Sequence, residues 1–407
     1  MVDAVVDLEK RGIRYYWILC IVGLFAILSS TMSKNPVLNL YSTSLGTPNA
    51  WTGFIAAAST IPGILISLPA GSLSDVFGRR KMLLISGIIF ASAPFLYLFI
   101  NSWWELIPIR FYHGFATAIF VPVANAAIVD LFPAKKGARI STFSSMTLVG
   151  RGIAPFMGGY ILLVTNNSYN DLYLAVGVAG VTALLVGLPF LLKKDLSPAA
   201  TAGDGSAKAM VRGWGNVARN KSVQIVAFVE SVQYYVYGAV EYFLVGYLKD
   251  VVGLDSFLIG VISGGYIIMV MLSKPFMGTL SDRIGRRPPI AFGAVVMGLP
   301  LIAIPFTTNY IAIIALTLVY GLGFAIVTSS TPALASEVVP KAFVGTSMGF
   351  LSTVMDVGQT IGPIISGFIL SSLFGYTGLF LSLTVLLVFS SAVFLLSGVG
   401  KGIPKEE

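Results

Sequence analysis

Hydrophobic runs alternate with short polar segments along almost the whole chain. Most runs are long enough to cross a bilayer as a helix, which takes about 20 mostly apolar residues. We predict one helix that ends near 40 and helices at about 51–70, 82–100, 223–248, 257–270, 290–306 and 310–334, with others between them. A long polar stretch, 195–222, is rich in Ser, Ala, Gly and charged residues, so we predict a linker that divides the runs into two groups.

Composition places the chain in a membrane. Charged residues make up 11% of it, whereas they are about a quarter of a typical soluble domain. The net charge of +8 does not indicate nucleic acid, because most Lys and Arg lie at the two ends or in alternate loops. This distribution predicts a multi-pass protein of the cell membrane with both termini in the cytoplasm. The first apolar run is too long for a cleavable signal peptide.

A polar segment between two runs returns about half a chain later, as GSLSDVFGRR from 71 and GTLSDRIGRR from 278. The first Gly allows close helix approach, and the Asp can pair with a base or cap a helix. The second Gly turns the chain, and the Arg pair keeps the loop in the cytoplasm. The residues predicted to form these conformational-switch loops are Gly71, Asp75, Gly78, Arg79, Arg80, Gly278, Asp282, Gly285, Arg286 and Arg287. A repeat at this spacing in a hydrophobic protein indicates a duplicated membrane half.

The pattern G-x-L-S-D-x-x-G-R-R resembles the loop between helices 2 and 3 of the major facilitator superfamily, with its echo between helices 8 and 9. The resemblance extends over nearly the whole chain. It implies an all-α membrane protein of twelve transmembrane helices in two pseudo-symmetric six-helix bundles, with alternating access between them. The bundles are expected over 1–194 and 223–407, joined by a cytoplasmic linker over 195–222. The motif does not identify a substrate.

The end of the first helix is polar over 29–36 and contains Lys34. Polar groups at that depth need a cavity or a bundle interior to face. Pro36 is expected to kink the helix. Two interpretations of Lys34 stay open: a cation that extends to the outer interface, and a cation of the transport cavity.

A second polar group is expected on helix 4. Its Arg-x-x-x-Gly segment, Arg110 to Gly114, is similar to a superfamily motif whose Arg lies in the transport cavity of drug:proton antiporters. Arg110, Gly114 and Asn125 project within about 60° of one another, which predicts one polar, closely packed face. His113 is interpreted as a hydrogen-bonded cavity wall in preference to a proton relay.

Helix 5 carries glycines around a proline. Its segment from 150 to 159 is similar to the G-x-x-x-G-P-x-x-G-G pattern of the superfamily's antiporters, but Ala154 replaces a Gly and Arg151 adds an unusual charge. The proline bends the helix, and the glycines allow it to rock against the other bundle. A similar pattern of glycines around a proline occurs in the second half, at Pro363. The predicted hinge residues are Gly150, Arg151, Pro155, Gly158, Gly159, Gly362 and Pro363.

The helix expected at about 223–248, helix 7, has acids and phenols along one face. Glu230, Tyr234, Tyr237 and Glu241 project within about 60° of one another. Asp356 on helix 11 lies about three turns from the cytoplasmic side. We expect Glu230 to face the central cavity and to take up a coupling proton, with Asp356 as the rival position.

The buried charges differ in sign between the halves. The N-terminal helices contain Lys34, Arg110 and Arg151, and the C-terminal helices contain Glu230, Glu241 and Asp356. Each isolated charge at such depth costs at least ~2.5 kcal/mol on insertion scales. We therefore expect opposite charges to pair across the central cavity in one conformational state and to separate in another.

These features favour a secondary transporter, most simply a proton-coupled, multidrug-like exporter of small organic molecules. The alternative is a proton symporter or facilitator for organic anions or metabolites. A receptor or scaffold would be expected to carry a large extramembrane domain. We expect no enzymatic activity and no cofactor, because no nucleotide-binding loop is evident, and no metal site, because the chain has one His and one Cys. The expected partners are a small-molecule substrate, protons and the lipid bilayer, with no nucleic acid, for a protein that acts as a monomer.

Overall fold

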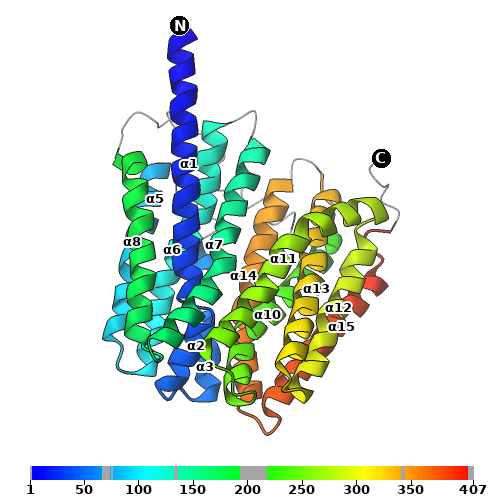
Figure 1. The fold of residues 1–407 in the computed structure, drawn as a ribbon. Coiled ribbons are helices and arrows are strands. Elements are labelled where there is room, and N and C mark those ends of the chain that lie inside the picture. The colour runs from blue at the N-terminus through cyan, green and yellow to red at the C-terminus, as the bar shows by residue number, and fades with distance from the viewer. Residues whose placement is uncertain are drawn as a thin grey trace.

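The computed structural model describes residues 2–66, 74, 77–132, 136–192, 217, 219–340 and 344–401. Within these ranges the regular structure is helical, with no strand. Figure 1 shows two groups of helices side by side, one from each half of the chain, with both termini at the same end of the molecule.

The first group contains α1 (Val2–Met32), α2 (Val37–Ser44), α3 (Asn49–Ala57), α5 (Arg79–Leu96), α6 (Leu106–Leu131), α7 (Lys136–Val164) and α8 (Tyr169–Leu192). The second group contains α10 (Lys221–Asp250), α11 (Ser256–Ile284), α12 (Arg287–Ala303), α13 (Tyr310–Glu337), α14 (Val344–Leu370) and α15 (Gly375–Ser397). Short 3-10 turns, among them Tyr97–Phe99 and Ile304–Phe306, extend α5 and α12.

Eleven helical segments in the described ranges are long and apolar enough to cross a membrane. One of these segments combines α1 with α2, and another combines α3 with the helical residues 61–66. The 30-residue α10, which carries the stripe of acids and phenols, is the twelfth. The twelve transmembrane helices in two pseudo-symmetric bundles are therefore confirmed. Most of the predicted linker lies outside the described residues, and α10 begins at Lys221.

Two helices of the first bundle are interrupted. The first breaks between α1 and α2 at 33–36, where Pro36 confirms the expected kink. The second breaks at 58–60, between α3 and the helical residues that follow. Both breaks place polar residues, Lys34 in the first and Ser59 and Thr60 in the second, in the wall of one cavity.

The repeated loops share a glycine turn and an arginine ion pair in both halves. Gly78 and Gly285 have φ values of 92° and 91°, which residues with a side chain rarely adopt. Arg79 is ion-paired with Asp130 at 3.1 Å. Arg286 is ion-paired with Glu337 at 2.7 Å, and the two partners are 51 residues apart in both cases.

Other contacts complete these loops. Arg286 also pairs with Asp282. Burial alone would lower the pKa of Arg286, but its hydrogen bonds to Glu337 and Asp282 outweigh burial and raise the pKa, so the guanidinium stays charged. Arg287 donates to the Leu395 carbonyl. Gly71 and Asp75 lie outside the described residues, and the side chain of Arg80 has buried nitrogens without a partner among the described residues.

The two bundles meet through glycines on α7 and α11. A Cβ at Gly159 would lie 2.5 Å from the Ser256 carbonyl, and one at Gly260 would lie 2.5 Å from the Pro155 carbonyl. Gly159 and Pro155 therefore face the other bundle, as expected. In the same way, Pro363 contacts Gly53 of the first bundle. Helix α11 is longer than the predicted 257–270, because it continues through polar residues to Ile284.

Three hinge glycines pack within their own bundle instead. Gly150 contacts the backbone of α1 at Leu24, so the expectation that it faces the other bundle is wrong. Gly158 lies against Met32, and Gly362 contacts the Tyr235 backbone of α10. These glycines allow neighbouring helices of one bundle to approach closely.

Candidate functional site

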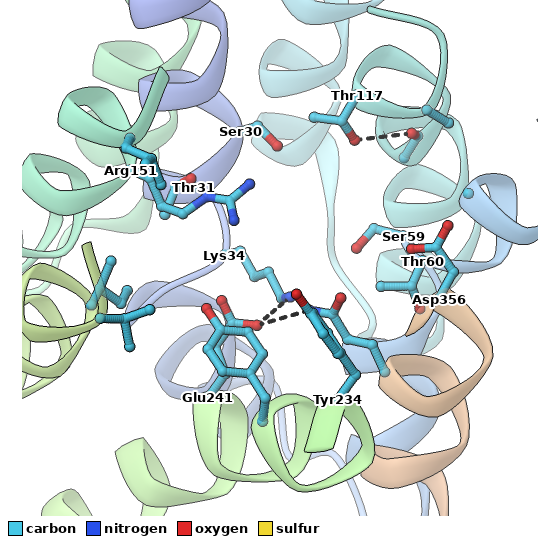
Figure 2. Close-up of a pocket in the computed structure, with 18 of the residues that line it drawn as sticks. Ser30, Thr31, Lys34, Ser59, Thr60, Thr117, Arg151, Tyr234, Glu241 and Asp356 are labelled. Carbon is cyan, nitrogen blue, oxygen red and sulfur yellow. Dashed lines mark hydrogen bonds and ion pairs between the residues drawn. The ribbon is translucent and has the colours of Figure 1, made fainter. Parts of the chain in front are cut away.

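A cavity of about 310 Å³ lies between the two bundles. Its volume is at the lower end of the range for small-molecule sites, roughly 300–1,000 Å³. Residues of α1, α6 and α7 line it from the first bundle, and residues of α10, α11, α13 and α14 from the second. Figure 2 shows that Arg151 of α7 points into this cavity.

Most of the predicted pathway residues line the cavity: Lys34, Arg110, His113, Tyr234, Tyr237, Glu241 and Asp356. Arg151, which the sequence placed in the hinge, joins them. Asn125 and Glu230 are not in the lining.

An ion pair joins the bundles at Lys34 and Glu241. The Lys34 Nζ lies 2.5 Å from the Glu241 Oε2, as Figure 2 shows. The Gln359 amide also donates to this oxygen, at 3.5 Å. The pair confirms the expected contact between opposite charges of the two halves, and the interpretation of Lys34 as a cation of the outer interface is wrong. Its members are 207 residues apart, the spacing that also separates Arg79 from Arg286.

Hydrogen bonds between the bundles accompany this ion pair. Ser42 and Tyr242 share one at 2.5 Å, and Asn167 accepts one from Ser256 at 2.6 Å. These contacts lie toward the end of the molecule opposite the termini, where Figure 1 shows α2 and α3 beside α10 and α14. The ion pair therefore belongs to the closed end of the cavity.

Arg110 is held on the wall formed by the first bundle. It is 2% exposed, and its Nη2 donates to the Ser59 hydroxyl at 2.5 Å. Ser59 belongs to the break after α3, and a Cβ at Gly114 would collide with the Ser59 carbonyl. Gly114 is therefore the residue that lets the break approach α6 closely enough for the Arg110 contact.

Asp356 faces the first bundle from α14. A Cβ at Gly63 would lie 2.7 Å from the Asp356 Oδ2. One turn further along α14, Thr360 shares a hydrogen bond of 2.6 Å with Thr60. No hydrogen bond or ion pair to the Asp356 carboxylate occurs in the described part of the chain.

Glu230 lies outside the cavity, which corrects the expectation from its helical projection. It is 1% exposed and accepts a hydrogen bond from Thr331 of α13. Asn125 is half-buried on α6, and its side-chain oxygen has no partner among the described residues. Glu230 projects toward the polar face of its helix but lies at a level where α13 covers it.

Lys274 of α11 is a cavity residue that the sequence analysis missed. It lines the cavity, its Nζ lies 5.9 Å from the centre of the Phe324 ring, and it interacts electrostatically with Glu230. The expectation that the second half contributes only negative charges is therefore wrong. Helix α11 continues through Lys274 and Pro275 to Ile284.

No group of three or more His, Cys, Asp or Glu side chains gathers as a metal site in the part of the chain that the structure describes. The cavity instead combines charged groups, hydroxyls and aromatic rings. Such a lining can bind a polar organic molecule and move a proton.

The family assignment follows from the whole chain. The family model of the Major Facilitator Superfamily matches residues 19–245 and again 225–406. The chain belongs to the Major Facilitator Superfamily. As a superfamily member it is a multi-pass membrane transporter and not an enzyme.

Two superfamily relatives cover most of the chain. An uncharacterised MFS-type transporter of Methanocaldococcus jannaschii is 22% identical over 344 residues, which span 82% of this chain and 86% of the relative. Multidrug resistance protein MdtG of Proteus mirabilis is 28% identical over 360 residues, which span 85% of this chain and 86% of the relative.

A solved transporter structure has the same fold. A bacterial homologue of the human lysosomal transporter Spinster, in an inward-facing and unoccupied conformation, superposes with a TM-score of 0.76. The match covers 95% of this chain and 96% of the other at 16% sequence identity. At that identity the likeness supports the fold of two bundles around a central cavity.

Proposed function

We propose that this transporter exports small organic molecules in exchange for protons, by alternating access to the central cavity. The observation that carries the proposal is Asp356, an acidic side chain without a partner for its carboxylate in the described residues, in a cavity between two bundles. The relatives named multidrug resistance protein MdtG support small organic molecules as the cargo. A proton gradient would supply the energy, and one copy of the chain forms the whole cavity, which supports action as a monomer.

We assign the coupling proton to Asp356 in preference to Glu230. An ionised carboxylate against the backbone at Gly63, without a hydrogen-bond donor, is costly, and protonation removes that cost. A proton on Asp356 therefore favours contact between the two bundles at this point. The other charged groups that line the cavity are Lys34, Arg110, Arg151, Glu241 and Lys274, and Tyr234 interacts electrostatically with Asp356.

The orientation in the membrane is part of the proposal. Most Lys and Arg lie at the ends and in alternate loops, which supports cytoplasmic termini in a plasma membrane. The contacts between the bundles lie toward the opposite end. In this orientation the described conformation is closed to the outside and presents its cavity to the cytoplasm, ready to receive a molecule for export.

The test is transport in proteoliposomes with an imposed pH difference. An exchanger accumulates substrate on the acidic side, because protons leave that side as substrate enters it. Asp356→Asn should abolish this accumulation and still allow exchange of substrate down its own gradient. Glu230→Gln is the matched control and should still accumulate substrate. Loss of accumulation in Glu230→Gln with full accumulation in Asp356→Asn would move the proton site to α10.

A proton symporter for organic anions is the second candidate, and the excess of cations in the cavity favours it. A symporter moves substrate and protons in the same direction. The same proteoliposomes therefore distinguish the two functions, because a symporter accumulates substrate on the alkaline side whichever way the protein is inserted.

A further inference from the structure

Positive groups outnumber negative groups in the wall of the cavity. Among the described lining residues the cations are Lys34, Arg110, Arg151 and Lys274, and the acids are Glu241 and Asp356. Lys34 and Glu241 neutralise each other, and Lys274 interacts with Glu230 outside the lining. Two cations, Arg110 and Arg151, therefore face one acid, Asp356. Low-dielectric walls focus such a charge, so the cavity attracts anions.

Arg110 carries the most buried of these charges. It is 2% exposed, its Nη2 donates to the neutral Ser59 hydroxyl, and its Nε is buried without a partner in the described chain. No carboxylate in the described residues forms an ion pair with it. Burying a guanidinium without an anion beside it costs free energy, and an anion that binds there offsets this cost.

His113 lies one helical turn from Arg110 on the same wall. It is 2% exposed, and both of its ring nitrogens are buried without a partner in the described chain. The rings of Phe90 and Tyr97 hold it edge-on, at centroid distances of 6.4 and 6.1 Å. One nitrogen of a neutral imidazole is a donor, so His113 supplies a second hydrogen bond beside the guanidinium.

The second bundle provides an aromatic wall across the cavity. Tyr237 and Phe324 are stacked at 4.8 Å, and Tyr234 meets Phe324 edge-on at 5.3 Å. All three line the cavity. An apolar group of a ligand can pack there while its charged group reaches α6.

We propose that the substrate is an amphipathic organic anion, with its acidic group bound by Arg110 and His113 and its apolar part on the wall formed by Tyr234, Tyr237 and Phe324. The assignment rests on the proposed function, because it takes the cavity as the transport path. The substrate supplies the anion that Arg110 lacks. Asp356 forms no ion pair with Arg110 in the described residues and holds the proton.

Binding to the purified full chain in lipid nanodiscs tests the substrate class. The probes are phenylacetate, phenylacetamide and phenethylamine, which share an aromatic ring and differ in charge. Thermal-shift titrations at one pH give the affinity, because a ligand that binds the folded state raises the melting temperature. Phenylacetate should bind about tenfold or more tighter than the other two probes, since hydrogen bonds to charged groups are stronger than neutral ones.

Two variants locate the anion site. Arg110→Gln should weaken phenylacetate binding about ten- to hundredfold. His113→Phe keeps an aromatic ring and removes both nitrogens, so it should weaken binding by a smaller factor and tests the site if Arg110→Gln does not fold. Arg139→Gln is the control, because Arg139 stacks on Tyr16 and Phe132 outside the cavity lining. Its affinity should equal that of the unmodified protein.

Preferential binding of phenethylamine or phenylacetamide would overturn the anionic class, and so would unchanged affinity in both Arg110→Gln and His113→Phe. Neither result would affect proton exchange, which is measured with a pH difference and an Asp356 variant. Conversely, two results together would support the anion site and refute the proposed exchange. The first is phenylacetate binding that persists in Asp356→Asn, and the second is the absence of pH-driven accumulation in the unmodified protein.

Discussion

The ion pair between Lys34 and Glu241 should stabilise the conformation that is closed at the end opposite the termini. Removing one member of a buried ion pair costs about 3–5 kcal/mol. The side chains are 18% and 7% exposed and face a cavity, so solvent reduces the effect. We expect Lys34→Met to shift the balance between conformations by about 1.4–2.8 kcal/mol, within the range for contacting residues. This corresponds to a shift of about ten- to hundredfold toward bundles separated at that end.

Spin-label distances between the bundles measure this shift. Asp171 and Ser371 are exposed residues of different bundles, and Cys at these positions, with Cys20→Ala, provides the label sites. Lys34→Met should enlarge the population with a long label distance. The exchanged pair, Lys34→Glu with Glu241→Lys, should restore the original distribution.

Lys249→Met is the control, because it removes an exposed lysine from the last turn of α10, the helix that carries Glu241. It should leave the label distances unchanged. An unchanged distribution in Lys34→Met, or an equal shift in Lys249→Met, would refute a role of the ion pair in closing this end.

Three further changes test the packing of the bundles and the repeated loops. Gly159→Val should slow transport without unfolding the protein, because the added carbons meet the backbone at Ser256 and cost about 1–3 kcal/mol of contact between the bundles. Gly137→Val on the same helix is the control: a Cβ there has no neighbour within 4 Å, so the transport rate should be unchanged. Gly285→Ala should cost about 1–3 kcal/mol in thermal unfolding, because of its positive φ. Arg286→Lys should lower the stability by about 1 kcal/mol, because lysine cannot contact both Asp282 and Glu337 as the forked guanidinium does. The exposed Arg283→Lys is the control, and equal melting temperatures for the two variants would contradict a stabilising role of the Arg286 contacts.

The helices and their grouping could be predicted because bilayer length and hydropathy act on each segment separately. The correspondence between the two halves could be predicted from the repeated loops, because each copy is a short local pattern. A contact between opposite buried charges of the two halves was also expected, since such charges need partners, but the sequence did not indicate that Lys34 and Glu241 form it.

The positions of other site residues depend on neighbours that one helix does not encode. Glu230 shares an angular stripe with Tyr234, but α13 covers the helix at Glu230 and provides Thr331 as its partner. Gly150 belongs to a hinge pattern, yet α1 occupies the space beside it. Lys274 follows the apolar part of its helix, so hydropathy alone ended that helix too early.

The spacing of 207 residues between Lys34 and Glu241 also bears on how the two bundles arose. The same spacing relates the repeated loops, so the two residues occupy equivalent positions in the two repeats. In a symmetric dimer of identical bundles, equivalent positions on the axis carry identical residues, and two lysines or two glutamates would repel each other there. This contact could form only after the sequences of the two bundles had diverged.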